Sequence, residues 1–119
     1  MLHFIFVTRS KKRILEGVLA HRIKELFFDC ADSNRWTINE IDIQPDHLYM
    51  TIEHDPNVSV DKMAKYFRKS THILYREFPG LGEFQYGKEF WYEGYFAATS
   101  IADTDEMRKD YLREVNEIQ

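Results

Sequence analysis

A strictly alternating run at residues 47–53 most restricts what this chain can fold into. Its even positions are apolar and its odd positions are polar or aromatic: Leu48, Met50 and Ile52 against His47, Tyr49, Thr51 and Glu53. Successive side chains of a strand point to opposite faces of a sheet. The run therefore predicts a strand with one buried face and one outward face. His47 and Tyr49 lie on the outward face, about 7 Å apart along the strand.

Three further segments predict the rest of a sheet. Residues 3–8 form a short apolar run, and Pro45-Asp46 supplies a turn before the alternating strand. Residues 35–43 are strand-like, but their apolar positions change parity, which predicts a bulge near Glu40. Residues 90–100 are rich in aromatic and β-prone residues and predict a fourth strand, with Gly94 as a candidate bulge.

Helical spacing of apolar residues predicts three helices. The first covers residues 14–30, and Cys30 falls on its apolar side. The second covers residues 60–78, with Ser59 as N-cap and Pro79-Gly80 as terminator. The third begins with the capping-box-like residues 103–106 and carries one apolar stripe: Met107, Tyr111, Val115 and Ile118.

The order strand, helix, strand, strand, helix, strand, helix predicts an α+β fold. It is the split βαβ, ferredoxin-like or RRM-like arrangement, a four-stranded antiparallel sheet with two helices on one face and an added C-terminal helix. The 119 residues contain no linker-like or low-complexity stretch, so we expect a single domain over residues 1–119.

The composition bears on compartment and partners. One cysteine cannot form an internal disulfide, and the opening heptapeptide has no basic n-region, so we expect a cytoplasmic protein with no signal peptide or membrane span. A net charge of -4 argues mildly against a nucleic-acid binder. The distribution weakens that objection, because cations cluster at residues 9–13 and recur at Arg68, Lys69 and Arg76.

Several motifs, taken in order, resemble those of a known family. They are residues 3–13 (HFIFVTRSKKR), Pro45-Asp-His-Leu-Tyr49, Asp55-Pro56 with Ser59, residues 74–79 (LYREFP), residues 91–96 (WYEGYF) and the helix around residues 106–111. Together they are similar, over nearly the whole chain, to the small single-tyrosine HUH transposases of bacterial and archaeal insertion sequences, REP-associated tyrosine transposases included.

The resemblance implies a metal-dependent enzyme. Such a transposase nicks single-stranded DNA beside a hairpin, becomes joined to the DNA 5′ end through tyrosine, and then rejoins strands elsewhere. By this resemblance Tyr111 is the nucleophile, His47 marks the metal position for Mg²⁺ or Mn²⁺, and the protein acts as a homodimer on hairpin DNA. A phenol with a pKa near 10 needs such help to attack a phosphodiester at neutral pH.

The chain departs from the family pattern at the metal site. Tyr49 stands where the family has a second histidine, and Val115 stands where several members have a glutamine ligand. A neutral phenol is a poor metal ligand. Glu53 is about 20 Å from His47 along the strand, which excludes it as a partner. Glu114 lies three residues after Tyr111, and its carboxylate is the candidate replacement for a hard cation.

The basic loop is the candidate DNA-binding segment. It contains Arg9, Lys11, Lys12 and Arg13, which suit salt-dependent contacts to phosphates. Arg68 and Lys69 are weaker candidates. Trp91, Tyr92, Tyr95 and Phe96 could stack on bases, but aromatic residues in a strand more often fill the core.

Two alternative functions stay open at this stage. The first is a relative that binds structured single-stranded DNA or RNA without cutting it, which the departures at Tyr49 and Val115 suggest. The second is a ferredoxin-like interaction module unrelated to nucleic acids. In both, Tyr111 would only pack on the apolar stripe of its helix.

Overall fold

Four antiparallel strands form the central sheet of the computed structural model, which describes residues 1–9, 13–78, 90–92, 94–99 and 109–115. The strands are β1 (Leu2–Val7), β2 (Ile38–Gln44), β3 (His47–Ile52) and β4 (Phe96–Thr99). They lie side by side in the order β2-β3-β1-β4, and every neighbouring pair is antiparallel. This confirms the predicted α+β, ferredoxin-like sheet.

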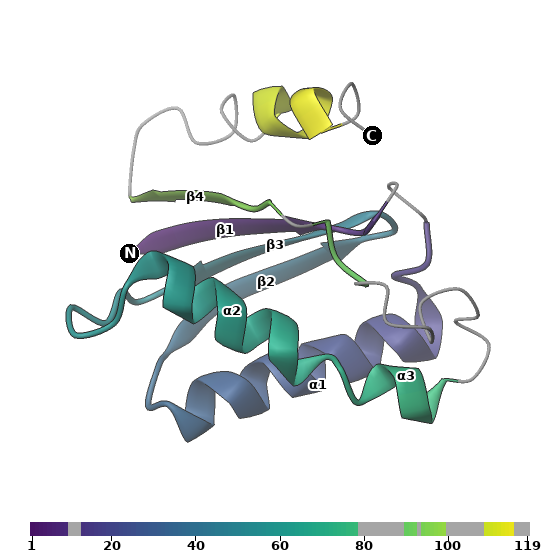
Figure 1. The fold of residues 1–119 in the computed structure, drawn as a ribbon, viewed down its shortest axis with the longest axis horizontal. Coiled ribbons are helices and arrows are strands. Elements are labelled where there is room, and N and C mark those ends of the chain that lie inside the picture. The colour runs from purple at the N-terminus through teal and green to yellow at the C-terminus, as the bar shows by residue number, and fades with distance from the viewer. Residues whose placement is uncertain (10–12, 79–89, 93, 100–108, 116–119) are drawn as a thin grey trace.

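Two helices cover one face of the sheet, as predicted (Figure 1). They are α1 (Gly17–Ser33) and α2 (Val60–Ser70), and a short α3 (Leu74–Glu77) follows. Leu48, Met50 and Ile52 of β3 are fully buried under these helices, together with Phe4 and Phe6 of β1. The alternating run therefore sets which face of the sheet is buried, as the sequence predicts.

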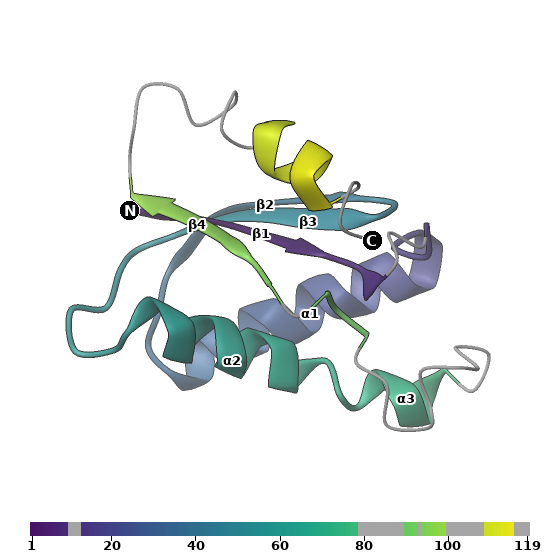
Figure 2. The ribbon, with the colours of Figure 1, turned by 45° about the horizontal axis from the view of Figure 1, so that its top comes forward.

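A third helical segment lies on the opposite face of the sheet. Residues 109–115 are helical, and Figures 1 and 2 both show them across the sheet from α1 and α2. The expectation that this face is open is therefore wrong in part, because the segment covers the part of it that bears Tyr49. The predicted start of this helix at 103–106, and Met107 and Ile118, lie outside the described residues.

The predicted bulge in the second strand is confirmed. The pairing of β2 with β3 shifts register between Ile38 and Glu40. The shift lets Ile38, Ile41 and Ile43 all pack against the core although their sequence parity differs. The strand begins at Ile38, later than the predicted residue 35. Trp36 precedes it and is buried in the core.

The prediction of one helix over residues 60–78 is wrong at its centre. Ser59 caps α2 as predicted, its side chain accepting from the Lys62 amide. However, α2 ends at Ser70, and Thr71 is its C-cap. The Thr71 hydroxyl donates to the Arg68 carbonyl at 2.7 Å and accepts from the Trp91 indole at 3.0 Å. These two bonds engage Thr71 at the end of α2, where side-chain bonding to the backbone competes with a continuing helix.

The fourth strand is shorter than the predicted 90–100. Among the described residues, the paired strand covers Phe96–Thr99, while the Tyr92 amide donates to the Val7 carbonyl at 2.7 Å and the Phe90 and Trp91 side chains fill the core. Trp91 makes one isolated bridge with Thr8. Gly94 marks no bulge in β4, since it lies before the strand. A Cβ at Gly94 would lie 2.6 Å from the ring of Tyr92, so this close approach requires glycine.

Candidate active site

His47 begins β3 and is held by its neighbour in sequence. Its Nδ1 lies 2.8 Å from Oδ1 of Asp46, and the two side chains are 16% and 20% exposed. When a carboxylate accepts from Nδ1, the Nε2 atom of a neutral imidazole can act as a ligand. The pairing fixes the ring orientation in the way that metal-binding histidines require. The sequence predicted that a strand begins at His47, but it did not predict the contact with Asp46.

Tyr49 points its hydroxyl to a different histidine. Its oxygen lies 2.6 Å from Nδ1 of His3, and the two rings stack with centroids 6.0 Å apart. On β1, His3 is in register with Thr51, whereas Val7 is in register with His47. The Tyr49 hydroxyl is thus engaged toward the far end of β3 from His47. His3 was missed from the sequence, although it shares the parity of Ile5 and Val7 on its strand.

Tyr111 lies on the same sheet face as Tyr49. A small apolar cluster joins them: Ile5 and Val7 of β1 and Val115 are buried, with Tyr49, Tyr92, Phe96, Tyr111 and Leu112 packed against them. The rings of Tyr111 and Phe96 have centroids 5.7 Å apart. Because Val7 pairs with His47, this cluster places the helix of Tyr111 beside the strand end that carries His47.

The hydroxyl of Tyr111 is buried without a hydrogen-bond partner among the described residues. An unsatisfied buried hydroxyl is uncommon in folded proteins and destabilises them. Burial, with smaller contributions from Tyr92 and Glu114, raises the pKa of Tyr111 to about 12, and Arg68 opposes this rise. The described residues provide no hydrogen-bond partner for the Tyr111 hydroxyl, and burial disfavours its ionised form.

The candidate metal ligands differ in how the structure positions them. In the described portion of the chain, no group of three or more His, Cys, Asp and Glu side chains is placed to hold a metal ion. His47 fits such a role, because Asp46 orients it. Tyr49 does not, since its hydroxyl is bound to His3. Val115 is buried and apolar, and Glu114 is exposed, so only Glu114 has a side chain that could turn to a shared cation.

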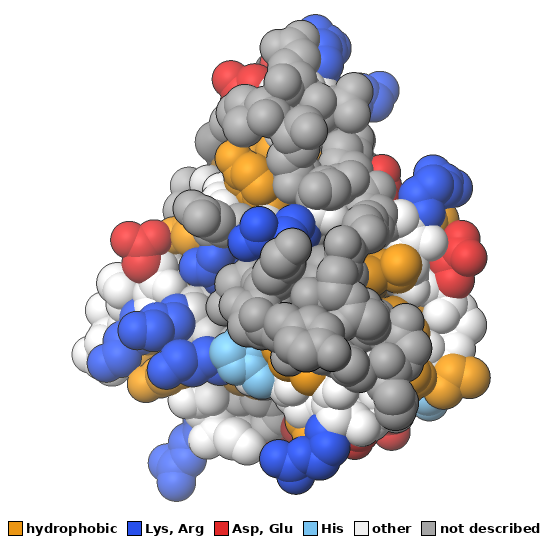
Figure 3. All heavy atoms as spheres, turned by 45° about the vertical axis from the view of Figure 1, so that its right-hand side comes forward, with side chains coloured by type: hydrophobic (Ala, Val, Ile, Leu, Met, Phe, Trp, Pro, Cys, Tyr) orange, Lys and Arg blue, Asp and Glu red, His pale blue; other side chains and the backbone are white. Residues whose placement is uncertain are grey.

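The basic candidates lie at the edge of the described structure. Arg9 is partly buried and its amide donates to the Phe90 carbonyl at 3.0 Å, while Arg13 is exposed. Lys11 and Lys12 lie outside the described residues. Arg68 is placed over the ring of Tyr95, 5.7 Å from its centroid. Figure 3 shows Lys and Arg side chains in several separate groups on one face of the molecule.

The aromatic residues near β4 serve the core more than an exposed stacking surface. Trp91 is fully buried, and Tyr95 packs against the core and hydrogen-bonds to Asp61 of α2.

Cys30 packs against the core, and burial raises the pKa of its thiol to about 11. A thiol with so high a pKa is a poor nucleophile.

The fold and this site define a ferredoxin-like domain that carries an oriented histidine and a buried tyrosine on one sheet face. Residues 1–115 match the sequence model of the family described as "Transposase IS200 like", and the chain belongs to this family. It is 26% identical over 113 residues to the transposase for insertion sequence element IS200 of Salmonella typhimurium, covering 93% of this chain and 73% of that protein. It is 22% identical over 111 residues to the ISDra2 transposase TnpA of Deinococcus radiodurans, covering 92% and 79%.

Solved structures have the same fold. One, assigned as a transposase of Deinococcus radiodurans R1, superposes with a TM-score of 0.86 at 20% identity, over 95% of this chain and 88% of that one. A REP-associated tyrosine transposase bound to a REP hairpin gives a TM-score of 0.63 at 14% identity, over 91% and 60%. No helix among the described residues is long and apolar enough to cross a membrane.

Proposed function

We propose that this member of the IS200-like family nicks and rejoins single-stranded DNA beside hairpins through a 5′-phosphotyrosine on Tyr111. The observation that carries the proposal is the buried Tyr111 hydroxyl, which has no partner within the described structure. Its helix packs on the sheet face next to the His47 end of β3. A buried hydroxyl without a partner, on the same sheet face as an oriented histidine, is the pattern expected of a nucleophile whose partner is the substrate.

The chemistry is a transesterification. The Tyr111 oxygen attacks the phosphorus of a phosphodiester, the bond from phosphorus to the 3′ oxygen breaks, and that oxygen takes a proton to become a 3′ hydroxyl. The tyrosine loses its own proton in the same step. Because burial raises the pKa of Tyr111 to about 12, the hydroxyl must be exposed to the DNA and its surroundings rearranged before attack. Rejoining is the reverse attack by a 3′ hydroxyl.

The proposal includes Mg²⁺ or Mn²⁺. His47 would be its protein nitrogen ligand, supported by the Asp46 contact to Nδ1, and Glu114 would be a carboxylate donor. A bound cation would polarise the scissile phosphate and stabilise the leaving oxygen. With Tyr49 engaged by His3, we expect the ion to be held more weakly than by two histidines.

The proposed partners are a hairpin in single-stranded DNA and a second copy of the chain. A bound REP hairpin in one structural relative supports the first. The charges along the two sheet edges bear on the second partner, another copy of the chain. Glu40 and Asp42 make the β2 edge acidic, so two copies would repel there, whereas β4 is uncharged over Phe96–Thr99. The homodimer would therefore join its sheets through β4.

A second candidate function is hairpin binding without cleavage. The observation that favours it is the contact from His3 to Tyr49, together with the burial of Val115, since both replace metal ligands by packing and a hydrogen bond. In that case the sheet face under the helix of Tyr111 would be purely structural.

The test uses labelled single strands from both flanks of the gene, with Mn²⁺. Retarded complexes are scored on native gels and covalent adducts on denaturing gels, with Tyr111→Phe as the matched variant. We expect adducts that vanish in the variant while the retarded complex persists. Retardation without any adduct would favour the non-cutting candidate. If neither retarded complexes nor adducts were seen, both candidate functions would be contradicted.

A further inference from the structure

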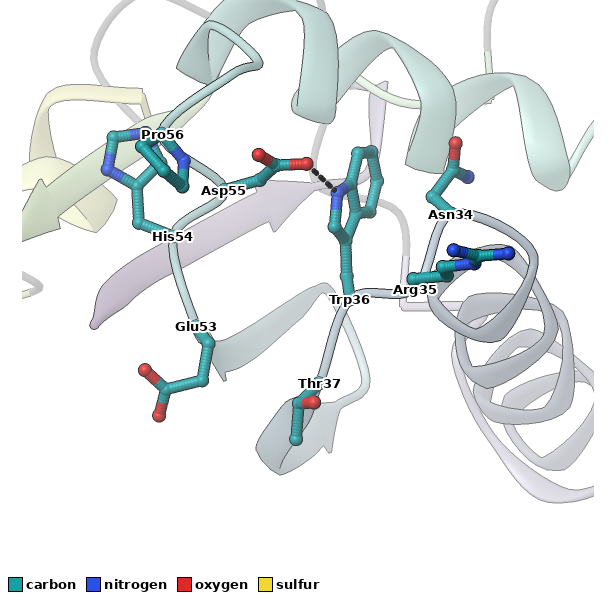
Figure 4. A pocket seen from close by; sticks show the side chains of 8 residues that line it. All are labelled: Asn34, Arg35, Trp36, Thr37, Glu53, His54, Asp55 and Pro56. Atoms are coloured by element: carbon teal, nitrogen blue, oxygen red, sulfur yellow. Dashed lines mark hydrogen bonds between the residues drawn. The ribbon is translucent and has the colours of Figure 1, made fainter.

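A cavity of about 380 Å³ lies at the opposite end of β3 from His47. Its walls are residues 34–37, between α1 and β2, and residues 53–56, between β3 and α2 (Figure 4). β3 begins at His47 and ends at Ile52, so this cavity is separate from the candidate active site. Its volume is within the range of sites that hold small organic ligands.

Arg35 lines this cavity in a backbone conformation that favours glycine. Its φ is 61°, the one positive value at a non-glycine position in the described part of the chain. The residue follows the C-cap Asn34, and its amide bonds to the Asp32 carbonyl at 3.1 Å while the Trp36 amide bonds to Ala31 at 2.8 Å. This is the Schellman ending of a helix, in which that position is usually glycine. The backbone alone would favour glycine, so the arginine side chain is the feature to explain.

The two walls are bonded to each other. Nε1 of Trp36 donates to Oδ2 of Asp55 at 3.0 Å, and Oδ1 of Asp55 accepts from the Asn57 amide at 2.9 Å. Trp36 is 5% exposed and stacks on Tyr66 of α2. These contacts lower the pKa of Asp55 and keep it a carboxylate. The cavity is therefore formed in advance of any ligand, which limits the entropy lost on binding.

The side chains around the cavity supply three kinds of contact. Arg35 brings a permanent cation to one side, with its side chain extending over the end of α1, and the rings of His54 and Pro56 are at the other side (Figure 4). Glu53 and Asp55 bring carboxylate oxygens. A guanidinium binds phosphate, planar rings pack against a base, and carboxylates accept hydrogen bonds from exocyclic amino groups. One nucleotide carries all three complementary groups.

We propose that this cavity binds one unpaired nucleotide of the DNA strand, with its phosphate at Arg35 and an amino-bearing base (adenine, cytosine or guanine) at Glu53 and Asp55. The proposal rests on the proposed function, because it needs a single-stranded DNA substrate. It adds to that function a second contact point, at the far end of the sheet from Tyr111, which selects the strand by an unpaired base.

Arg35→Gly is a sharp test, because glycine suits the backbone there and the fold is kept. Binding to a hairpin with an unpaired adenine is measured over a range of salt concentrations, beside Lys24→Ala, which removes an exposed cation from α1. We expect Arg35→Gly to weaken binding about fivefold to tenfold and to reduce the slope of log affinity against log salt by about one. The melting temperature should stay equal or rise, and Lys24→Ala should bind like the unmodified chain.

Base preference gives an independent readout. The unpaired position is varied among adenine, cytosine, guanine and thymine, and Glu53→Gln keeps an acceptor for Asn39 while removing the charge. We expect thymine to bind at least threefold more weakly than adenine, and this ratio to shrink in Glu53→Gln.

Two results would overturn the inference while leaving the proposed function intact: unchanged hairpin affinity in Arg35→Gly, or equal affinity for all four bases. A chain that binds no hairpin at all would instead contradict the proposed function, and this inference with it. The adduct assay with Tyr111→Phe separates the two cases, since it does not depend on Arg35.

Discussion

The hydroxyl of Tyr49 on β3 is hydrogen-bonded to Nδ1 of His3 on β1, at 2.6 Å. The bond spans two neighbouring strands on the face covered by residues 109–115. It engages the tyrosine that stands where the resemblance to single-tyrosine transposases predicts a second histidine. The altered position therefore has a new partner within the protein.

Tyr49→Phe should remove this bond, so that Nδ1 of the partly buried His3 loses its contact with the Tyr49 hydroxyl. We expect a loss of about 1 kcal/mol in the free energy of unfolding, the usual value for such a bond. Urea denaturation of Tyr49→Phe, His3→Ala and the double variant measures it as a coupling energy. Strictly additive effects would mean that the two side chains contribute independently.

Tyr49→His should increase divalent metal affinity. An imidazole two residues after His47 on the same strand face is a far better ligand than a neutral phenol. We expect Mn²⁺ to bind at least tenfold more tightly, measured by calorimetry without DNA. His47→Ala in the same background should abolish the gain. If Tyr49→His bound Mn²⁺ no better than the unmodified chain, His47 would not be half of a metal site.

Tyr111→Phe should stabilise the folded chain. It removes a buried hydroxyl that has no partner among the described residues and keeps the aromatic ring against Phe96. We expect a gain of about 1 kcal/mol, the cost of an unsatisfied polar group. Thermal unfolding measures it, with Tyr66→Phe on α2 as the matched control. A destabilised Tyr111→Phe would show that the hydroxyl is satisfied in solution.

Tyr111 also predicts a pH dependence at the alkaline end. Burial raises the pKa of Tyr111 from the ordinary phenol value of 10.0 to about 12, so the unfolded chain releases this proton first. The folded state keeps the phenol neutral while the unfolded chain ionises it. The free energy of unfolding is therefore unaffected by this group below pH 10 and falls as the pH rises toward 12. Tyr95 behaves in the same direction, so the comparison must be with Tyr111→Phe. The variant should lose less stability over this interval than the unmodified chain, and parallel curves would contradict the shift.

The local periodicities predicted the fold well, and side-chain pairing was harder to predict. The alternation at residues 47–53 determined β3 and its buried face, because register is set by which parity is apolar. The break at Thr71 depends on a bond from Trp91, twenty positions away in sequence, which no local pattern contains. The same holds for residues 90–95, which come before β4: Trp91 keeps one bridge to Thr8 while its side chain fills the core.

The sequence offered candidate site residues, but it did not predict the contacts that they make. The motifs identified His47, Tyr49 and Tyr111, and the structure places Tyr49 and Tyr111 against one cluster. The contact of Tyr49 with His3 joins positions 46 residues apart, and only the β1–β3 register brings them together. Whether Glu114 turns to a cation, and what Lys11 and Lys12 contact, stay predictions.

The most direct test of the central claim is to locate the DNA on the protein. After reaction with a hairpin strand and Mn²⁺, the adduct is digested with nuclease and trypsin and the modified peptide is sequenced by mass spectrometry. Trypsin cuts after Lys109 and Arg113, so Tyr111 lies in the peptide 110–113, whereas Tyr49 lies in 36–62. The account predicts a 5′-linked nucleotide on Tyr111. A nucleotide on Tyr49 or any other residue would contradict it.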